Sequence, residues 1–225
     1  MSSTVDVSFP IQGSEIHLDH GYALFAAVSR LVPQIHEQPT WGIHPIRGAA
    51  IERGRLTLTQ HSHINIRLPD VHIAAVLPLA GQRIEIDGDS VTCGIPKIWP
   101  LRPTSSLQSK IVVVASVVDV KAPENDQRGQ IASSMRRKLA HLPLEMDPDR
   151  LQLNIGRRHI VRIGAKRSKP RGAETVFDRD IVVGFQVILE GLDATASLVV
   201  QSHGLGGRRH IGCGIFVPTP RVGTA

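Results

Sequence analysis

The sequence predicts an α+β protein made of two tandem ferredoxin-like domains, residues 1–103 and 104–225. The 225 residues are enough for two domains of about 100 residues each, a common domain size. Segments with alternating apolar residues are interleaved with amphipathic segments in the order β-α-β-β-α-β, and this order occurs twice. The proline-rich residues 96–103 separate the two runs and are expected to be a linker.

The first run opens with a strand, since residues 5–13 alternate apolar and polar side chains. A helix is expected over residues 18–35, with Asp19 capping its start and Pro33 limiting its end. Its apolar residues recur at helical spacing and are Leu24, Phe25, Val28, Leu31 and Val32. The rest of the run is expected to be two strands, a short helix and a strand with a hairpin, at residues 41–48, 55–68, 69–81 and 83–101.

The second run opens with a strand over residues 110–118, and a long helix follows over residues 124–142. The apolar side of this helix is expected to consist of Ile131, Met135, Leu139 and Leu142. The remaining elements are expected to be a strand and hairpin with a basic loop, a strand, a short helix and a final strand, at residues 151–172, 180–192, 193–207 and 210–218.

The charge of the chain is concentrated in its second half. The net charge is +6 and the pI is about 9.9. Residues 1–108 carry 8 Lys and Arg against 9 Asp and Glu, a balance of −1, whereas residues 109–225 carry 18 against 11, a balance of +7. This basic excess indicates a polyanionic partner that contacts the second half.

The number of cysteines and the length of the apolar runs indicate the cellular compartment of the protein. Cys93 and Cys213 are too few and too far apart for a disulfide framework, and both are expected to be core thiols. The N-terminus lacks the basic and apolar regions of a secretory signal, and no apolar run is long enough to span a bilayer. We therefore expect a cytoplasmic protein without membrane contact.

A glycine-rich segment near the C-terminus, residues 202–218, is the most distinctive part of the sequence. It follows an expected helix and opens a strand, which excludes a dinucleotide-binding loop, and it lacks the Gly-Lys-Ser/Thr end of a P-loop. Glycines allow positive φ and close approach to a phosphate, so the segment is either a phosphate contact or a tight connection without a ligand. Its glycines and the polar residues between them are Gly204, Gly206, Gly207, Gly212, Gly214, Arg208, Arg209 and His210.

The chain contains 11 histidines, and imidazole suits acid–base chemistry near neutral pH. His61 and His63 have a spacing that could bind zinc, but no nearby cysteine or pair of acids completes a site. No metal and no small-molecule cofactor are therefore expected.

The glycine-rich segment resembles the signature of the repeat-associated RNA-binding superfamily, whose Cas-six-type branch processes CRISPR transcripts. Residues 204–218 are similar to the form found in the MYXAN subtype. Residues 19–37, 42–48 and 182–192 resemble the first helix, the loop after it and a later strand of the same family. The resemblance implies two ferredoxin-like domains and a metal-independent endoribonuclease that cuts repeat RNA. The ribose 2′-OH would attack the phosphate and leave a 2′,3′-cyclic phosphate and a 5′-OH.

The resemblance also implies catalytic residues near the first helix. His36 matches the position where several family members have a catalytic histidine after this helix, while His20 at the helix start and His44 in the following loop are alternatives. Ser29 stands where some relatives place a catalytic tyrosine, and its shorter side chain departs from that pattern. Which histidine is the base and which the acid stays open.

RNA contacts are expected from the glycine-rich segment and from two basic stretches. Aromatic residues make up 4% of the chain, which favours recognition of phosphates and stem shape over base stacking. The expected partner is the stem-loop of a CRISPR repeat, with subunits of an effector complex as further partners. The basic residues are Arg136, Arg137 and Lys138 on the long helix, and Arg157, Arg158, Arg162, Lys166, Arg167 and Lys169 in the hairpin and loop.

Two other functions remain open at this point. The protein could be a non-catalytic RNA-binding subunit of a CRISPR effector complex, because that superfamily includes such subunits. It could also be an unrelated ferredoxin-like protein that binds a small ligand. Cleavage of repeat RNA by the purified protein would distinguish the endoribonuclease from the non-catalytic subunit. Failure to bind any structured RNA would favour the unrelated ferredoxin-like protein.

Overall fold

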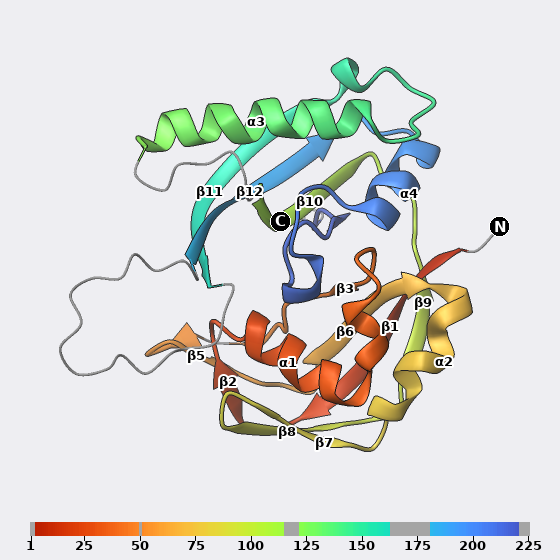
Figure 1. The fold of residues 1–225 in the computed structure, drawn as a ribbon, viewed down its shortest axis with the longest axis vertical. Coiled ribbons are helices and arrows are strands. Elements are labelled where there is room, and N and C mark those ends of the chain that lie inside the picture. The colour runs from red at the N-terminus through yellow and green to blue at the C-terminus, as the bar shows by residue number, and fades with distance from the viewer. Residues whose placement is uncertain (1–2, 50, 115–121, 163–180, 221–225) are drawn as a thin grey trace, which may run out of the picture.

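The computed structural model describes residues 3–49, 51–114, 122–162 and 181–220, which form two halves stacked on one another (Figure 1). In the C-terminal half, four strands form an antiparallel sheet in the order β11-β12-β10-β13. With its two helices, this half has the element order and strand order of the ferredoxin-like fold. Its elements are β10 (Ser106–Val113), α3 (Glu124–Ala140), η4 (Pro148–Arg150), β11 (Gln152–Arg162), β12 (Ile181–Glu190), α4 (Ala194–His203), η5 (Arg209–Ile211) and β13 (Val217–Pro218).

The N-terminal half has the same architecture with additions. Its main sheet has the order β3-β6-β1-β8-β7, and β9 also pairs with β1. A small second sheet has the order β2-β5-β4. The strands are β1 (Thr4–Gln12), β2 (Glu15–His17), β3 (Gly42–Ile43), β4 (Ile51–Glu52), β5 (Arg55–Thr57), β6 (His63–Pro69), β7 (Arg83–Ile86), β8 (Asp89–Cys93) and β9 (Lys97–Pro100). The helices are α1 (Gly21–Leu31), η1 (Pro33–His36), η2 (Asp70–His72), α2 (Ile73–Val76) and η3 (Leu77–Leu79).

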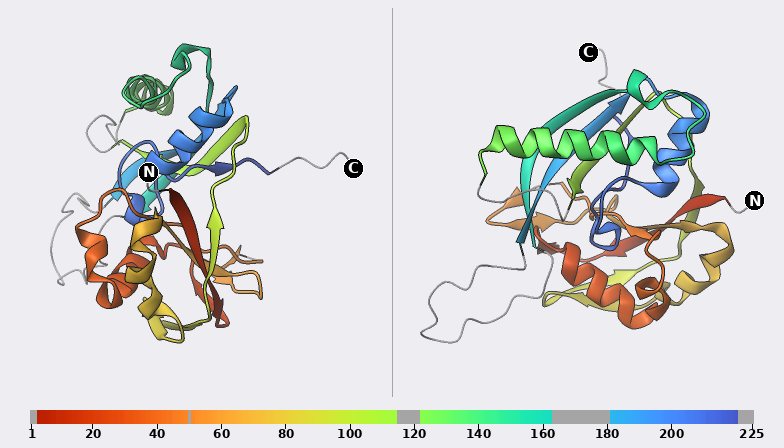
Figure 2. Two further views of the ribbon diagram at one scale, coloured as in Figure 1. Left: turned by 90° about the vertical axis from the view of Figure 1, so that its right-hand side faces the viewer. Right: turned by 45° about the horizontal axis from the view of Figure 1, so that its top comes forward.

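The two sheets turn their helix-free faces toward each other (Figure 2). Side chains alternate between the faces of a strand, and in β1 the apolar residues Val5, Val7 and Phe9 pack into the core beneath α1 and α2. Asp6 and Ser8 therefore point the other way, toward the C-terminal half. In the C-terminal half, α3 and α4 bury the opposite face of β12 in a separate core.

The predicted tandem ferredoxin-like fold is confirmed, with corrections to single elements. The expected linker contains β9, an exposed edge strand that pairs with β1, since prolines are tolerated at a sheet edge. The expected final strand shrinks to Val217–Pro218, because positive φ at Gly212 and Gly214 turns the chain away from the sheet. The N-cap of α1 is His20 and not the predicted Asp19, and the His20 side chain makes no capping hydrogen bond.

Three further expected elements are shorter than predicted. The strand over residues 41–48 is reduced to β3, the strand over residues 55–68 is divided into β5 and β6, and the helix over residues 69–81 is four α-helical residues between two 3-10 turns. The predicted core thiols Cys93 and Cys213 are both free and buried. Among the described residues, no helix has the length and apolar character to cross a membrane.

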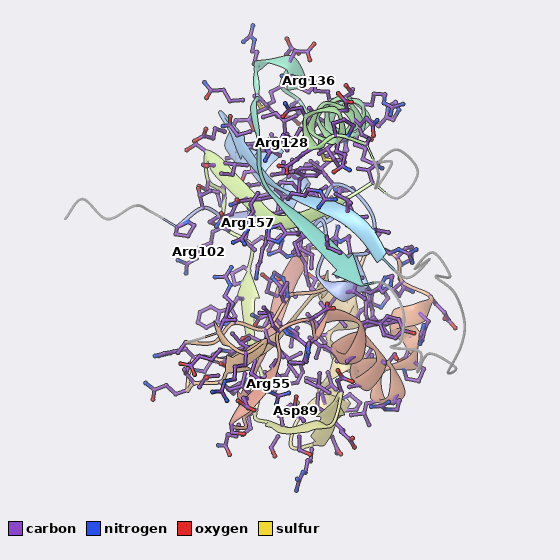
Figure 3. All side chains as sticks on the ribbon, turned by 90° about the vertical axis from the view of Figure 1, so that its left-hand side faces the viewer. Arg55, Asp89, Arg102, Arg128, Arg136 and Arg157 are labelled. Atoms are coloured by element: carbon purple, nitrogen blue, oxygen red, sulfur yellow. The ribbon has the colours of Figure 1, made fainter. Side chains whose placement is uncertain are left out.

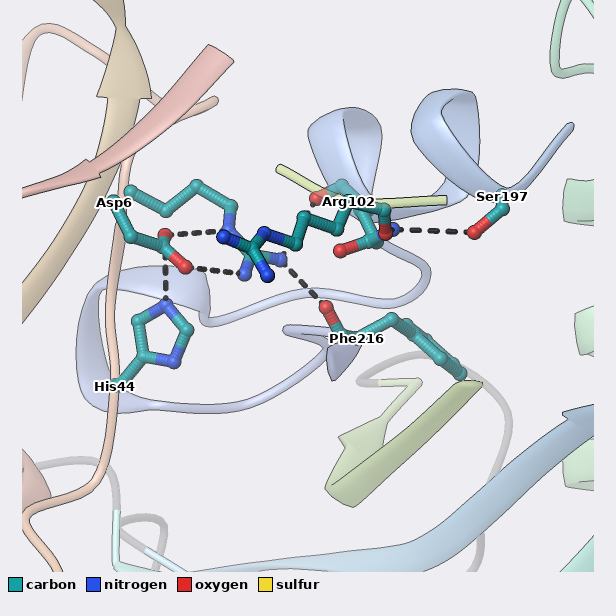
Figure 4. A network of polar contacts seen from close by, with 7 residues as sticks. Asp6, His44, Arg102, Ser197 and Phe216 are labelled. Atoms are coloured by element: carbon teal, nitrogen blue, oxygen red, sulfur yellow. Dashed lines mark hydrogen bonds and ion pairs between the residues drawn. The ribbon is translucent and has the colours of Figure 1, made fainter. Parts of the chain in front are cut away.

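A buried guanidinium connects the two halves (Figure 4). Arg67 in β6 is 1% exposed and forms a two-pronged ion pair with Asp6, with both nitrogen–oxygen distances at 2.7 Å. Its remaining nitrogen donates to two backbone carbonyls of the C-terminal half, Gln201 at 3.1 Å and Phe216 at 2.5 Å. Since Gln201 lies in α4 and Phe216 directly precedes β13, one side chain fixes the position of both elements over the N-terminal sheet.

The electrostatics of this bridge favour the ionised carboxylate. Burial alone would raise the pKa of Asp6, but hydrogen bonds from Arg67 and His44 outweigh it and hold that pKa well below its usual value. A carboxyl with a depressed folded-state pKa stabilises the fold above its unfolded pKa near 3.8 and loses that contribution as the pH falls toward the folded value. The link between the halves therefore weakens on acidification.

Replacing Arg67 with alanine should destabilise the protein by roughly 3–5 kcal/mol, the usual cost of removing one partner of a buried ion pair. Urea unfolding at neutral pH measures this loss. Arg55→Ala is the matched control, because Arg55 pairs with Glu15 and Asp89 at the solvent-exposed end of the N-terminal half (Figure 3). Solvent screens that pair, so its removal should cost much less. Equal losses in the two variants would contradict the bridging role of Arg67.

Candidate active site

The glycine-rich turn, residues 204–216, is tied to strand β10. Helix α4 ends at Gly204, which adopts φ +65°, ψ 179°, a conformation accessible almost only to glycine. The N–H groups of Gly207 and Gly214 donate to the carbonyls of Val113 and Ile111 at 2.9 and 2.7 Å. Leu205 N–H donates to Gly214 O at 3.2 Å, which closes the turn on itself.

The turn also rests on the N-terminal half. A Cβ atom at Gly21, the first residue of α1, would lie 2.6 Å from the carbonyl oxygen of Ile211. A Cβ at Gly212 would lie 2.8 Å from Pro45. Such close approach requires glycine at both positions, so the turn and the start of α1 fit together without side chains between them.

Two histidines from opposite halves meet on one phenyl ring. The ring of Phe25 in α1 lies 5.0 Å from the His36 ring in an edge-on arrangement and 4.5 Å from the His210 ring. His36 ends η1 and is exposed, while His210 lies in η5 and is partly exposed. Both imidazoles are therefore accessible, and among the described residues neither ring is occupied by a hydrogen bond.

Arg208 adds a positive charge to this cluster. It is exposed and adopts a left-handed conformation with φ +66°, which is uncommon for a residue other than glycine. Burial lowers the pKa of His210, and the charges of Arg208 and His36 lower it further. The arrangement presents a neutral imidazole, a second imidazole and a guanidinium to solvent, which are the groups that metal-free phosphodiester cleavage uses.

A cleft of about 920 Å³ lies between the two sheets, on the other side of the turn. Ile211 and Gly212 contribute to its lining, whereas Phe25, His36 and His210 do not. Its polar wall comes from both halves and includes Asp6, His44, Asn65, Gln108, Lys110 and Gln186. Among the described residues, no group of three or more His, Cys, Asp or Glu side chains is arranged to hold a metal ion.

The sequence of the chain matches a known protein family. The family model described as Cas6 Crispr matches residues 5–221, nearly the whole chain. The chain belongs to the Cas6 family. A protein from Myxococcus xanthus (strain DK1622), described as CRISPR-associated endonuclease Cas6, is 36% identical over 218 residues, which cover 97% of this chain and 83% of the relative.

Solved structures agree on the fold of this Cas6-family chain. A structure described as CRISPR associated protein Cas6 superposes with a TM-score of 0.65 at 10% identity, covering 98% of this chain and 100% of the other. A second structure, described as an RAMP protein binding different RNA substrates, has a TM-score of 0.62 at 11% identity, with 98% and 100% coverage. The family resemblance that the glycine-rich segment and the first helix indicated is confirmed.

The four predicted catalytic residues do not form one group in this Cas6-family structure. His36 and Ser29 lie on the Phe25 side of α1, since Ser29 is four residues after Phe25 and its hydroxyl donates to Ala26 O at 3.2 Å. His20 and His44 line the cleft instead. The sequence placed all four near the first helix, but the turn separates them into two environments.

Both cleft histidines are engaged in holding the structure. His20 is buried, donates from Nδ1 to His17 O at 3.0 Å and accepts the Ile46 N–H at Nε2, also at 3.0 Å. Burial lowers the pKa of His20, which fits this neutral form. His44 contacts Asp6 through Nε2 at 3.3 Å, and its pKa is lowered by burial as well, although Asp6 opposes the shift. The rings of both residues are therefore occupied by hydrogen bonds within the protein.

Arg209 is not a surface contact. Its side chain is buried below the turn, where Nη1 donates to Ser202 O at 2.8 Å, and Nε and Nη2 have no hydrogen-bond partner among the described residues. Burial and the charge of Arg67 lower its pKa to about 10, with Asp6 partly opposing. The prediction that Arg209 touches RNA is therefore corrected, because its neighbour Arg208 carries the exposed charge.

The basic residues of the C-terminal half are spread over its length. Arg136 lies at the end farthest from the N-terminal half and contacts Asp149 at 3.7 Å (Figure 3). Arg158 donates to Gln127 Oε1 at 2.9 Å and thus faces α3, while Arg157 is exposed. Arg137 is exposed and Lys138 partly exposed beside Arg136. Arg162 belongs to β11, and Lys166, Arg167 and Lys169 lie outside the described residues.

Phe25 and Arg67 are the functional residues that sequence reasoning missed. The helical spacing grouped Phe25 with the apolar residues of the helix, and it is partly buried against the core, but its contact with two histidines carried no signal. No sequence signal distinguishes Arg67, a lone arginine in an apolar strand, from a solvent-exposed one. Asp6 can be recognised as its partner only once the pairing of β1 with β6 is known, because that register places Asp6 directly opposite Arg67.

Gly204→Ala should destabilise the turn, because the conformation of Gly204 costs about 1–3 kcal/mol in any other residue. Its Cβ would also contact the carbonyl of Gly214 and lie 2.9 Å from Arg209 Nη1. Gly207→Ala is the matched control, since Gly207 has ordinary φ and no atom within 4 Å of an added Cβ. Urea unfolding should show a loss only for Gly204→Ala. A comparable loss in Gly207→Ala would contradict this geometry.

Proposed function

We propose that this Cas6-family protein is an endoribonuclease that cleaves CRISPR repeat RNA at the cluster of Phe25, His36, Arg208 and His210. The carrying observation is that the histidine after the first helix and the glycine turn, distant in sequence, meet on one phenyl ring. The name of the Myxococcus xanthus relative, a CRISPR-associated endonuclease at 36% identity, supports the activity.

The chemistry is metal-independent attack of the ribose 2′-OH on the adjacent phosphate. A base removes the 2′-OH proton, an acid protonates the departing 5′-oxygen, and the products carry a 2′,3′-cyclic phosphate and a 5′-OH. Imidazole can perform either step near neutral pH, and His36 is exposed to solvent. Arg208 is exposed on the same turn as His210, and its guanidinium stabilises charge on the phosphate oxygens in the transition state.

The substrate is the stem-loop of the repeat, held by the basic C-terminal half. Residues 109–225 carry 18 Lys and Arg against 11 Asp and Glu, and exposed Arg157, Arg136 and Arg137 extend this charge away from the cluster. Subunits of an effector complex then receive the product. The buried free thiols Cys93 and Cys213 fit a reducing compartment such as the cytoplasm.

The test incubates purified protein with labelled RNA of the neighbouring CRISPR repeat, with and without EDTA. The proposal expects one cut, unchanged in EDTA, and no cut when the nucleotide before it carries a 2′-deoxy sugar. Binding of the RNA without any cut would identify the protein as a non-catalytic RNA-binding subunit. Absence of binding would exclude repeat RNA as the substrate.

His36→Ala should lower the single-turnover cleavage rate by roughly 10²–10⁴-fold, the usual contribution of a general acid or base. The dissociation constant for a 2′-deoxy repeat RNA should stay unchanged, because the phosphate contacts remain. His141→Ala, at the exposed end of α3, is the matched control and should cut at the wild-type rate. Normal cleavage by His36→Ala would place the chemistry elsewhere.

RNA affinity should fall steeply with salt, because bound phosphates release counterions. Arg208→Ala should reduce the slope of log Kd against log salt by about one, the effect of losing one phosphate contact. Arg55→Ala is the control and should leave the slope unchanged, because the Arg55 guanidinium is already paired with Glu15 and Asp89. Filter-binding titrations between low and moderate salt measure both. If the RNA affinity of the wild-type protein did not change with salt, binding through phosphate contacts would be contradicted.

A further inference from the structure

We propose that His210 is a second catalytic residue, the base that takes the 2′-OH proton, and that His36 is the acid opposite it. This assignment rests on the proposed function and goes beyond the phosphate contact that the sequence indicated for His210. It also requires the two halves to act together, because η1 supplies one imidazole and η5 the other.

The first support is the geometry of the two rings. In-line attack places the entering 2′-oxygen and the departing 5′-oxygen on opposite sides of phosphorus, so base and acid must stand apart with the phosphate between them. His36 and His210 each contact Phe25, at 5.0 and 4.5 Å between ring centroids. Two accessible imidazoles thus contact the same phenyl ring, and the charge of Arg208 acts on His210.

The second support is the protonation that the surroundings favour. The groups that act on His210 are its partial burial, Arg208 on its own turn and His36 from η1, and all three lower its pKa. On α1 the neighbours of the turn are Phe25 and Tyr22, which packs against Ile211 and Cys213. A base must be neutral before reaction, so these surroundings suit His210 to that role and leave protonation of the leaving group to His36.

The third support is the rigidity of the turn. Its backbone hydrogen bonds to β10, and the close approach of Ile211 to Gly21, fix the position of His210 without help from RNA. The carbonyl of Arg208 accepts N–H bonds from Ile211 and Cys213 at 3.1 and 3.2 Å, so two backbone hydrogen bonds span His210. A catalytic group needs such support, because it must be held rigidly in the productive geometry.

The step balances as follows. The 2′-oxygen forms a bond to phosphorus as its proton passes to the His210 imidazole. The bond between phosphorus and the 5′-oxygen breaks, and His36 gives its proton to that oxygen. The enzyme ends with the two histidines in exchanged protonation states, which solvent resets. No oxidant, metal or other reactant takes part.

The test uses a repeat RNA whose bridging 5′-oxygen at the cut is replaced by sulfur, since a thiolate leaves without protonation. We expect His36→Ala and His210→Ala each to lose at least about 100-fold in rate on ordinary RNA. On the sulfur substrate, His36→Ala should recover to near the wild-type rate while His210→Ala should not. His141→Ala should match wild type on both substrates, and thermal melting and binding of 2′-deoxy RNA should confirm that each variant folds.

Wild-type protein provides a test that depends on no variant. Its cleavage rate on ordinary RNA should rise and then fall with pH, and the rising limb should have its midpoint below 6.5, the ordinary histidine value from which the His210 pKa is lowered. With the sulfur substrate the falling limb should disappear and the rising limb remain.

Three results would overturn the assignment. These are full activity of His210→Ala on ordinary RNA, recovery of His210→Ala instead of His36→Ala by sulfur, or loss of the rising limb with the sulfur substrate. Failure of the proposed function gives different results. The wild-type protein would then cut neither substrate, or the His36→Ala variant would cut both substrates at the wild-type rate.

Discussion

The contact of Arg67 with both halves is the constraint on which the site depends. Its guanidinium satisfies Asp6 in the N-terminal sheet and two backbone carbonyls that flank the glycine turn, at Gln201 and Phe216. A buried charge of this kind tolerates little displacement, because every lost hydrogen bond leaves a polar group unpaired in a low-dielectric interior. These contacts therefore fix the position of the glycine turn relative to α1. The second guanidinium nearby, Arg209, lies inside the same turn without a carboxylate of its own, so the balance of charge at this interface depends on Asp6.

The position of the turn explains how two separate surfaces arise. On one side, Ile211 and Gly212 close the end of the cleft between the sheets, where His20 and His44 hold the loop after the first helix by hydrogen bonds. On the other side, His210 is carried onto Phe25 beside His36. The histidines of the cleft stabilise the frame, and those on Phe25 remain accessible for chemistry. Replacement of a frame histidine is therefore expected to act through folding, whereas under the proposed function replacement of His36 or His210 is expected to act on the reaction.

The sequence was sufficient for the architecture and for the family but not for the grouping of residues. Alternation and helical spacing identified β1, α1, α3 and β12, because burial on one face dictates those patterns. The glycine turn was recognisable because positive φ and close packing restrict its positions to glycine. Patterns of this kind carry no information on which side chains from different elements meet. The contact of Phe25 with two histidines, the burial of Arg209 and the pairing of Arg67 with Asp6 therefore carried no sequence signal. The separation of His20 and His44 from His36 was equally invisible, because it depends on how the two halves pack.

The most direct test of the central claim is a crystal structure of the protein with a 2′-deoxy repeat RNA that binds without being cut. The account predicts the scissile phosphate over Phe25, between the rings of His36 and His210, with the guanidinium of Arg208 on a non-bridging oxygen. A scissile phosphate inside the cleft, beside His44 and Lys110, would contradict it.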